Sequence, residues 1–258
     1  MRLKINVAME YALAPDDPAL LAITAAETQG QKVLESDLAI DNATVRWIDG
    51  ECGIGDRVWA SAQGPRLKLR YLARVDVIRP DVVLRKLNAA PLPALPGDVL
   101  TFVRPSRFCP SDQLASFTEK RFGHLAGADK IAAIAEWVAR SLSYIAGSSH
   151  AGTTAIDTFV TREGVCRDYA HLVCALARAA NIPARYSSAY GPDVSPPDFH
   201  AVAEVWLEGA WHIVDATGMS SAANLVVIAS GRDAGDIPFM ETANWAELIG
   251  QSVEVSRE

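Results

Sequence analysis

The segment from His200 to Asp215 constrains the fold more than any other part of the chain. Apolar and polar residues alternate along His200–Leu207, as they do in a half-buried β-strand. A two-residue turn at Glu208–Gly209 or Gly209–Ala210 would lead into a second strand at Trp211–Asp215. The sequence therefore predicts an antiparallel hairpin at this point of the chain.

Both registers available to this hairpin place His200 and Asp215 on the same face of the sheet. If Leu207 pairs with Ala210, the two residues are diagonal neighbours, with backbones roughly 7–8 Å apart. In the alternative register Glu204 lies opposite Asp215, and the shared face is kept because directly paired residues point to the same side. A three-residue loop would instead put the histidine and the aspartate on opposite faces. The two-residue turn therefore predicts an imidazole within reach of a carboxylate.

Cys166 stands at the head of a segment that the sequence predicts to be helical. Apolar residues recur at steps of three and four from Ala170 to Ala180, and Asn181 and Pro183 terminate the pattern. A thiol at a helix N-terminus lies near unpaired backbone N–H groups, which lower its pKa and favour the nucleophilic thiolate. An unreactive cysteine is the alternative interpretation, because free cysteines often pack as small apolar side chains.

Cys166, His200 and Asp215 together supply a nucleophile, a base and a carboxylate that orients the base. Gly164, two positions before the cysteine, would allow a tight approach of the chain into the helix. Tyr144 is a candidate fourth residue of the active site, because a phenol beside the thiolate could donate a hydrogen bond to an oxyanion. A core tyrosine with its hydroxyl at the rim is the alternative interpretation of Tyr144.

At these residues the sequence resembles the transglutaminase-like cysteine enzymes, specifically their bacterial branch with an N-terminal β domain. The resemblance covers about residues 98–240 and rests on four ordered motifs. These motifs are Gly164–His171, Ala177–Tyr186, Asp198–Ala201, and Glu204–Trp211 leading into Val214–Thr217. Membership of this family implies a papain-like core, with the cysteine on a helix and the histidine and aspartate on neighbouring antiparallel strands.

Two residues depart from the family pattern. Val202 stands where many members carry a tryptophan after the histidine and alanine, and Ala216 stands where many carry a proline after the aspartate. Both differences are expected to change the acyl-acceptor side of the cleft rather than the triad itself.

Residues 1–97 are predicted to form an N-terminal antiparallel β-sandwich domain. Short alternating runs are separated by turn residues there, and Arg66–Val77 is the strongest strand signal. A proline-rich connector at 80–110 precedes three segments with helical patterns, at 111–121, 130–143 and 153–163. Residues 98–258 are assigned to the catalytic domain. The predicted fold class is α+β, with a papain-like or transglutaminase-like core of helices against an antiparallel sheet.

Composition excludes several other classes of protein. A net charge of −7 and a pI near 5.3 argue against a nucleic-acid-binding protein, which needs a basic face. No apolar run reaches the length of a transmembrane helix, and no secretory leader is evident, so we expect no membrane association and a cytoplasmic location. Cysteines at 52, 109, 166 and 174 show neither C-x-x-C nor zinc-site spacing, so free thiols, no metal and no cofactor are expected.

The function predicted from these residues is thiol-dependent acyl transfer through a thioester, on a peptide, protein or other amide substrate. A cysteine peptidase or amidase is favoured, because the low aromatic content of 7% leaves few residues to wall off a dry channel to the acyl-enzyme. A protein transamidase is one alternative. A catalytically silent binding module of the same fold is the other. The sequence leaves the natural substrate and the oligomeric state open.

Overall fold

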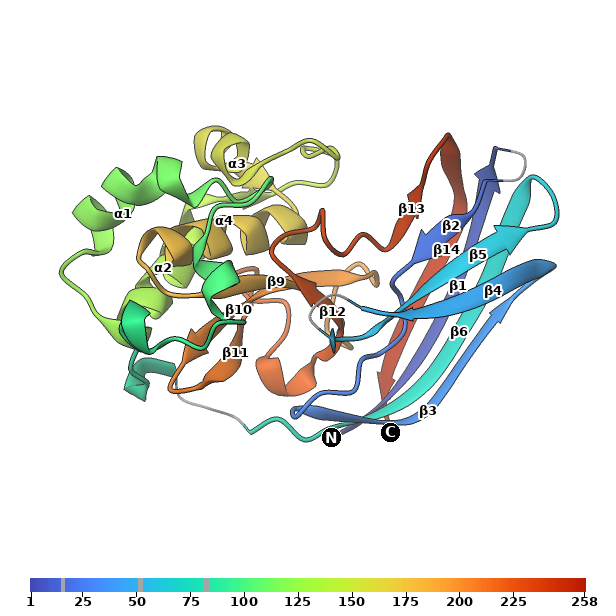
Figure 1. The fold of residues 1–258 in the computed structure, drawn as a ribbon, viewed down its shortest axis with the longest axis horizontal. Coiled ribbons are helices and arrows are strands. Elements are labelled where there is room, and N and C mark those ends of the chain that lie inside the picture. The colour runs from blue at the N-terminus through green and yellow to red at the C-terminus, as the bar shows by residue number, and fades with distance from the viewer. Residues whose placement is uncertain (15–16, 51–52, 81–83) are drawn as a thin grey trace.

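Two antiparallel sheets of four strands each make up the strand-rich part on the right of Figure 1. The computed structural model describes residues 1–14, 17–50, 53–80 and 84–258. The first sheet has the order β14–β1–β6–β3, with β1 at Arg2–Leu13, β3 at Gln31–Ile40, β6 at Arg66–Val77 and β14 at Ala246–Arg257. The second has the order β13–β2–β5–β4, with β2 at Ala19–Leu21, β4 at Ala43–Asp49, β5 at Asp56–Ala62 and β13 at Met240–Thr242.

The alternating sequence of β1 and β6 explains how this part is held together. Successive side chains of a strand point to opposite faces, so every second residue of these strands enters the core. The buried set comprises Leu3, Ile5, Val7, Met9 and Tyr11 from β1, and Leu67, Leu69, Tyr71, Ala73 and Val75 from β6. The predicted α+β class, with a strand-rich N-terminal region, is confirmed.

The C-terminal segment, which the sequence analysis assigned with the rest of residues 98–258 to the catalytic domain, pairs with strands from the start of the chain. β14 pairs with β1 from Leu3↔Arg257 to Leu13↔Ala246, and β13 pairs with β2. Residues 240–257 therefore belong by hydrogen bonding to the N-terminal sheets. The sequence analysis missed this pairing because alternation identifies a strand but does not identify its partner. The boundary near residue 97 stays a prediction.

A third sheet, of four antiparallel strands, carries the predicted hairpin. Its order is β11–β10–β9–β12, with β9 at Ala184–Tyr190, β10 at His200–Leu207, β11 at Ala210–Val214 and β12 at Val226–Gly231. A short parallel pair, β7 at Ser143–Tyr144 and β8 at Glu163–Gly164, lies close to the start of the cysteine helix in the chain.

The helices gather on the left of Figure 1 and cover the third sheet. They are α1 (Ala115–Phe122), α2 (Gly127–Ser141), α3 (Ala155–Thr161) and α4 (Cys166–Ala179), and α4 packs against β9 and β10. Short 3-10 turns occur at Leu84–Lys86, Leu92–Ala94, Leu100–Val103, Ser111–Leu114 and Ala222–Asn224. In the described part of the chain, no helix has both the length and the apolar character needed to cross a membrane.

The helix boundaries differ by a few residues from those expected. The segment at 111–121 begins as a 3-10 turn and becomes helical only at Ala115, and α2 begins at Gly127, before Asp129. Asp129 therefore lies within the first turn, where its carboxylate complements the helix dipole, and does not cap the helix. In α3 the cap is Thr154, whose backbone N–H donates to Asp157 Oδ2 at 2.8 Å.

The two parts of the molecule are joined at the edge strand β12. Gln31 is buried and binds both backbone groups of Val227, donating from Nε2 to the carbonyl and accepting the N–H at Oε1, each at 2.8 Å. The hydroxyl of Tyr190 donates to the carbonyl of Ile23 at 2.6 Å. These buried contacts fix the strand-rich part against the sheet that carries His200.

Candidate active site

The hairpin adopts the first of the two registers considered. Leu207 pairs with Ala210, and Ala203 pairs with Val214. The turn residues Glu208 and Gly209 have φ angles of 48° and 81°. Positive φ at both central residues is the property of a type I′ turn, whose twist matches that of the flanking strands. The two-residue turn therefore sets the register on which the position of Asp215 depends.

His200 and Asp215 meet as the register predicts. His200 Nε2 lies 2.9 Å from Asp215 Oδ2, and both side chains are buried. The carboxylate is held by three further donors, because Asp215 Oδ1 accepts from Thr217 N at 2.9 Å and Thr217 Oγ1 at 2.6 Å, while Oδ2 also accepts from Ser220 N at 3.1 Å. Burial raises the pKa of Asp215, but the hydrogen bonds from His200 and Thr217 outweigh it, so that the pKa is lowered. The carboxylate is thus ionised and fixed in position.

The imidazole of His200 lies between this carboxylate and the thiol of Cys166. Burial lowers the pKa of His200, but the hydrogen bond to Asp215 and the interaction with Cys166 outweigh burial and raise the pKa to about 9. The ring nitrogen Nδ1 is buried and has no hydrogen-bond partner within the described residues. In unliganded enzymes the hydrogen bonds used in catalysis are often long and tighten only when substrate binds. The structure therefore brings the predicted nucleophile, base and carboxylate together.

Cys166 is the first residue of α4, and the path of the chain into this helix depends on a contact between Gly164 and Asp168. The carboxylate of Asp168 reaches back to accept the N–H of Val165 at 2.8 Å. A Cβ on residue 164 would lie 2.7 Å from Asp168 Cβ, closer than such atoms approach in proteins. Residue 164 must therefore be a glycine, because Asp168, which closes the first turn of α4, occupies the space that a side chain at position 164 would need.

Asp168 also ties a neighbouring loop to the helix terminus. It is completely buried, and its Oδ1 accepts from Ser149 Oγ at 3.1 Å. Arg167 binds the same loop, donating to Ser149 Oγ at 2.8 Å and to the carbonyl of His150. Asp168 therefore closes the first turn of α4 and also positions the loop that follows Tyr144.

The phenol of Tyr144 lies beside Cys166. Burial raises the pKa of Tyr144 to about 12, and the neighbouring Cys166 contributes to the shift. The hydroxyl is therefore protonated at neutral pH and able to donate a hydrogen bond. The ring packs against Tyr169, with 5.9 Å between centroids, and the residue is 42% exposed. Tyr144 is thus at the rim of the site and not in the core.

Comparison with known proteins adds two observations to this geometry. Residues 116–216 match the transglutaminase-like superfamily. The structure also superposes on the crystal structure of a candidate cysteine protease from Cytophaga hutchinsonii, with a TM-score of 0.92 and 33% sequence identity over 99% of this chain and 90% of that one. This chain belongs to the transglutaminase-like superfamily. The predicted resemblance is confirmed.

Curated relatives share only part of their length with this transglutaminase-like chain. An uncharacterized protein of Mycobacterium leprae is 28% identical over 116 residues, which cover 42% of this chain and 41% of that protein. An uncharacterized protein of Mycobacterium bovis is 30% identical over 138 residues, or 48% of this chain and 44% of that protein. The match therefore spans less than half the length of these relatives.

Val202 does not lie where the sequence analysis expected. It is 1% exposed and packs in a small buried cluster with Ala189, Ile213, Leu225 and Val227. Ala216 is also buried. Because Val202 is enclosed in this cluster, its difference from other transglutaminase-like proteins does not open a wall of the cleft. The expectation that Val202 reshapes the acyl-acceptor side is wrong.

Glu204 has a partner of its own and takes no part in orienting His200. It is buried, and its Oε2 lies 2.5 Å from Nη2 of Arg185, while its Oε1 accepts from Ser187 Oγ at 2.8 Å. The guanidinium of Arg185 also stacks over Trp211, 4.3 Å from the ring centroid. Arg185 lies on β9, Glu204 on β10 and Trp211 on β11, so these contacts hold the three strands together.

Two further histidines and two further cysteines are accounted for by packing. His171 Nε2 accepts the N–H of Ala234 at 3.1 Å, and burial holds the pKa of His171 well below its usual value. His212 Nε2 meets the carbonyl of Leu207 at 3.2 Å. Cys109 and Cys174 are free and completely buried, whereas Cys166 is partly exposed. Cys52 lies outside the described residues.

Thr217 is the residue whose role the sequence analysis missed. It was noted only as the end of a motif, yet its N–H and hydroxyl supply two of the four hydrogen bonds to Asp215. The available signal was local, because an aspartate followed two residues later by a threonine is typical of turns in which the carboxylate binds its own backbone.

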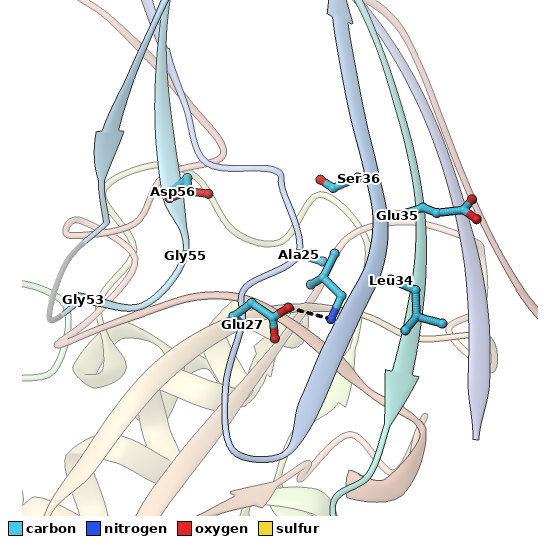
Figure 2. A pocket seen from close by; sticks show the side chains of 9 residues that line it. Ala25, Glu27, Leu34, Glu35, Ser36, Gly53, Gly55 and Asp56 are labelled. Atoms are coloured by element: carbon cyan, nitrogen blue, oxygen red, sulfur yellow. Dashed lines mark hydrogen bonds between the residues drawn. The ribbon is translucent and has the colours of Figure 1, made fainter.

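A cavity of about 460 Å³ lies in the strand-rich part, apart from the triad residues (Figure 2). Glu27 lines it and accepts the N–H of Val33 at 3.1 Å, while Leu34 and Glu35 point away from the other labelled side chains. Glu35 is paired with Arg74. Within the described residues, no group of three or more His, Cys, Asp and Glu side chains is arranged to hold a metal ion.

Proposed function

We propose that this chain is a thiol-dependent acyl-transfer enzyme that hydrolyses amide bonds of a peptide or protein. The observation that carries the proposal is the orientation of His200. Its Nε2 is bound to Asp215 at 2.9 Å, which leaves Nδ1 as the ring nitrogen available to the thiol of Cys166. A base held in this way between a carboxylate and a nucleophile is the arrangement that activates a cysteine.

In the proposed reaction Cys166 attacks the carbonyl carbon of an amide. His200 accepts the thiol proton at Nδ1 and returns it to the leaving amine, while the anionic Asp215 stabilises the imidazolium. The pKa of about 9 for His200 favours the imidazolium that this proton transfer produces. The product of this half-reaction is a thioester on Cys166. Attack by water then releases the acid and regenerates the thiol.

Two donors are proposed for the oxyanion that forms during the attack. The first is the N–H of Cys166, one of the groups at a helix N-terminus that have no partner inside the helix. The second is Tyr144, whose phenol lies beside the cysteine and stays protonated because its pKa is raised to about 12. A phenol that remains protonated can donate throughout the reaction.

Hydrolysis is favoured over transamidation by two observations. The chain is similar over 99% of its length to a protein described as a candidate cysteine protease. Tyr144, the aromatic residue beside the thiol, is 42% exposed, which gives water access to a thioester on Cys166. A transamidase must keep water from this intermediate. These two points add to the low aromatic content of the chain, on which the sequence-based argument for hydrolysis rests.

The experiment that tests this function measures how the acyl-enzyme is partitioned. Cys166 is acylated with 4-nitrophenyl acetate, and increasing concentrations of cadaverine are added. Hydrolysis predicts that acetate remains the main product at millimolar amine. A predominance of the amide would make the protein a transamidase. Failure of Cys166 to acylate faster than a small free thiol would favour the silent binding module. The cytoplasmic location stays a prediction from the sequence.

A further inference from the structure

Asp198 is a carboxylate beside the proposed site that has no role in the reaction as described. It lies two residues before His200, in the loop between β9 and β10. Its Oδ1 accepts from the N–H of Phe199 at 2.7 Å and from Nε2 of Gln251 at 2.6 Å. Gln251 belongs to β14, so a residue of the strand-rich part holds this carboxylate in place.

The charge of Asp198 has no cationic partner in the part of the chain that the structure describes. Among the described residues, no Lys, Arg or His side chain lies within ion-pair distance of it, and Oδ2 has no hydrogen-bond partner. Asp193, five residues earlier in the same loop, is paired with Arg257. Partial burial raises the pKa of Asp198, and the hydrogen bonds from Phe199 and Gln251 oppose this. Asp198 is therefore a fixed carboxylate with one oxygen free to bind a ligand.

The charge of Asp198 acts on two tyrosines. Burial is the main cause of the raised pKa of Tyr144, and the charges of Cys166 and then Asp198 also contribute. Asp198 contributes in the same way to the pKa of Tyr11 on β1. With its hydrogen bond to Gln251 of β14 and its place two residues before β10, Asp198 lies where the strand-rich part meets the strand that begins at His200.

The space next to Asp198 suits an aliphatic chain that ends in a positive charge. A cavity of about 180 Å³ lies between the loop after β9 and β14, with Asp198 in its wall. The rest of its lining is mostly apolar: Gly191, Pro192, Val194, Pro197, Val253 and Val255, together with Glu254. Lysine and arginine side chains lay their methylene groups along apolar surface and keep the charged end near an acceptor. An ammonium or guanidinium group would give Asp198 the cationic partner that the described residues do not supply.

We propose that Asp198 is a specificity-determining residue that binds a cationic side chain of the acyl donor. The inference rests on the proposed function, because it assigns a substrate class to the same site. The substrate class is an amide whose acyl side carries a lysine-like or arginine-like group within one side-chain length of the scissile carbonyl.

The test compares two activated esters that differ only at the end of the side chain. N-acetyl-lysine 4-nitrophenyl ester and N-acetyl-norleucine 4-nitrophenyl ester share their backbone and methylene stem, and only the first carries an ammonium group. The rate of acylation of Cys166 is measured from nitrophenolate release, as kcat/KM, for each ester. A partly exposed charge pair predicts a preference for the lysine ester of about five-fold. The Asp198→Asn variant keeps the side-chain shape and should reduce this preference to near unity without slowing the norleucine ester.

Asp193→Asn is the matched control, because it removes the same charge from the same loop at a residue already paired with Arg257. Its ester preference should equal that of the wild type. An equal loss in both variants would overturn the assignment to Asp198, because it would reflect net charge alone. Rapid acylation by both esters without a preference would also overturn the inference, while leaving the proposed function intact. Absence of acylation by either ester would instead overturn the proposed function.

Discussion

His200 and Asp215 come from the two strands of one hairpin and meet with 2.9 Å between Nε2 and Oδ2. The contact exists because the turn has two residues, which places both side chains on one face. It also determines which ring nitrogen remains for the thiol. The proposed chemistry of Cys166 therefore depends on a turn in the same chain that lies more than 40 residues away in sequence.

Replacing Asp215 with asparagine should remove turnover while preserving the fold. The asparagine oxygen can still accept from Thr217, but His200 loses its countercharge and its fixed tautomer. By analogy with other triads we expect kcat to fall about 10³-fold or more. Turnover is measured with the activated ester, and the fold is checked by urea unfolding. Retention of more than about a tenth of the wild-type kcat would contradict the role given to Asp215.

Glu204→Gln is the matched comparison, because it neutralises a second buried carboxylate on the same strand. It should lower stability, since Arg185 would be left without its countercharge, and we expect a loss of about 3–5 kcal/mol in the free energy of unfolding. Turnover per folded molecule should change much less than in Asp215→Asn. A greater loss of turnover in the folded Glu204 variant would mean that the wrong carboxylate has been assigned to His200.

The pKa of His200 should respond to both of its neighbours. Its value of about 9 is raised by Asp215 and by Cys166. Because the folded pKa lies above that of an unfolded histidine, the associated stability is fully present below about pH 6.5 and is lost as the pH rises through about 9. NMR titration of the imidazole should give a lower pKa in Cys166→Ala and in Asp215→Asn. An unchanged pKa in Cys166→Ala would show that the thiol does not interact with the ring.

Alkylation should distinguish Cys166 from the two other described cysteines. At about pH 6, iodoacetamide should modify Cys166 well before Cys109 or Cys174, because those two are completely buried and burial raises the pKa of Cys109. The modified residues are identified by mass spectrometry of the digested protein. Equal modification of Cys174 would refute the assignment of Cys166 as the reactive thiol.

Gly164→Ala should disturb the path of the backbone into α4, whose first residue is Cys166. The added Cβ would lie 2.7 Å from Asp168 Cβ, so the first turn of α4 must shift. We expect a loss of about 1–3 kcal/mol in stability, by analogy with overpacked cores, and slower alkylation of Cys166. Gly97→Ala provides the control, because nothing lies within 4 Å of a Cβ at that exposed position. Equal stability and alkylation rates in the two variants would show that the contact with Asp168 does not hold the helix entry.

Local patterns in the sequence were sufficient for the hairpin and for the helix that begins at Cys166. Alternation of period two and a two-residue turn place His200 and Asp215 on one face before any partner strand is known. These features depend on residues that are close together in the chain, and a short segment can adopt only a few backbone conformations.

Tertiary packing decided the features that involve distant segments. β14 pairs with β1 across more than 200 residues of sequence, and this pairing brings Gln251 to Asp198. Val202 has the pattern of a cleft residue, yet it is enclosed in a cluster that includes Leu225 from another part of the chain. The sequence of a strand determines which of its faces is apolar. The backbone N–H and C=O groups along its edges, however, can pair with any other strand. The choice of partner, and so the surroundings of the thiol, is therefore made only when the whole chain packs.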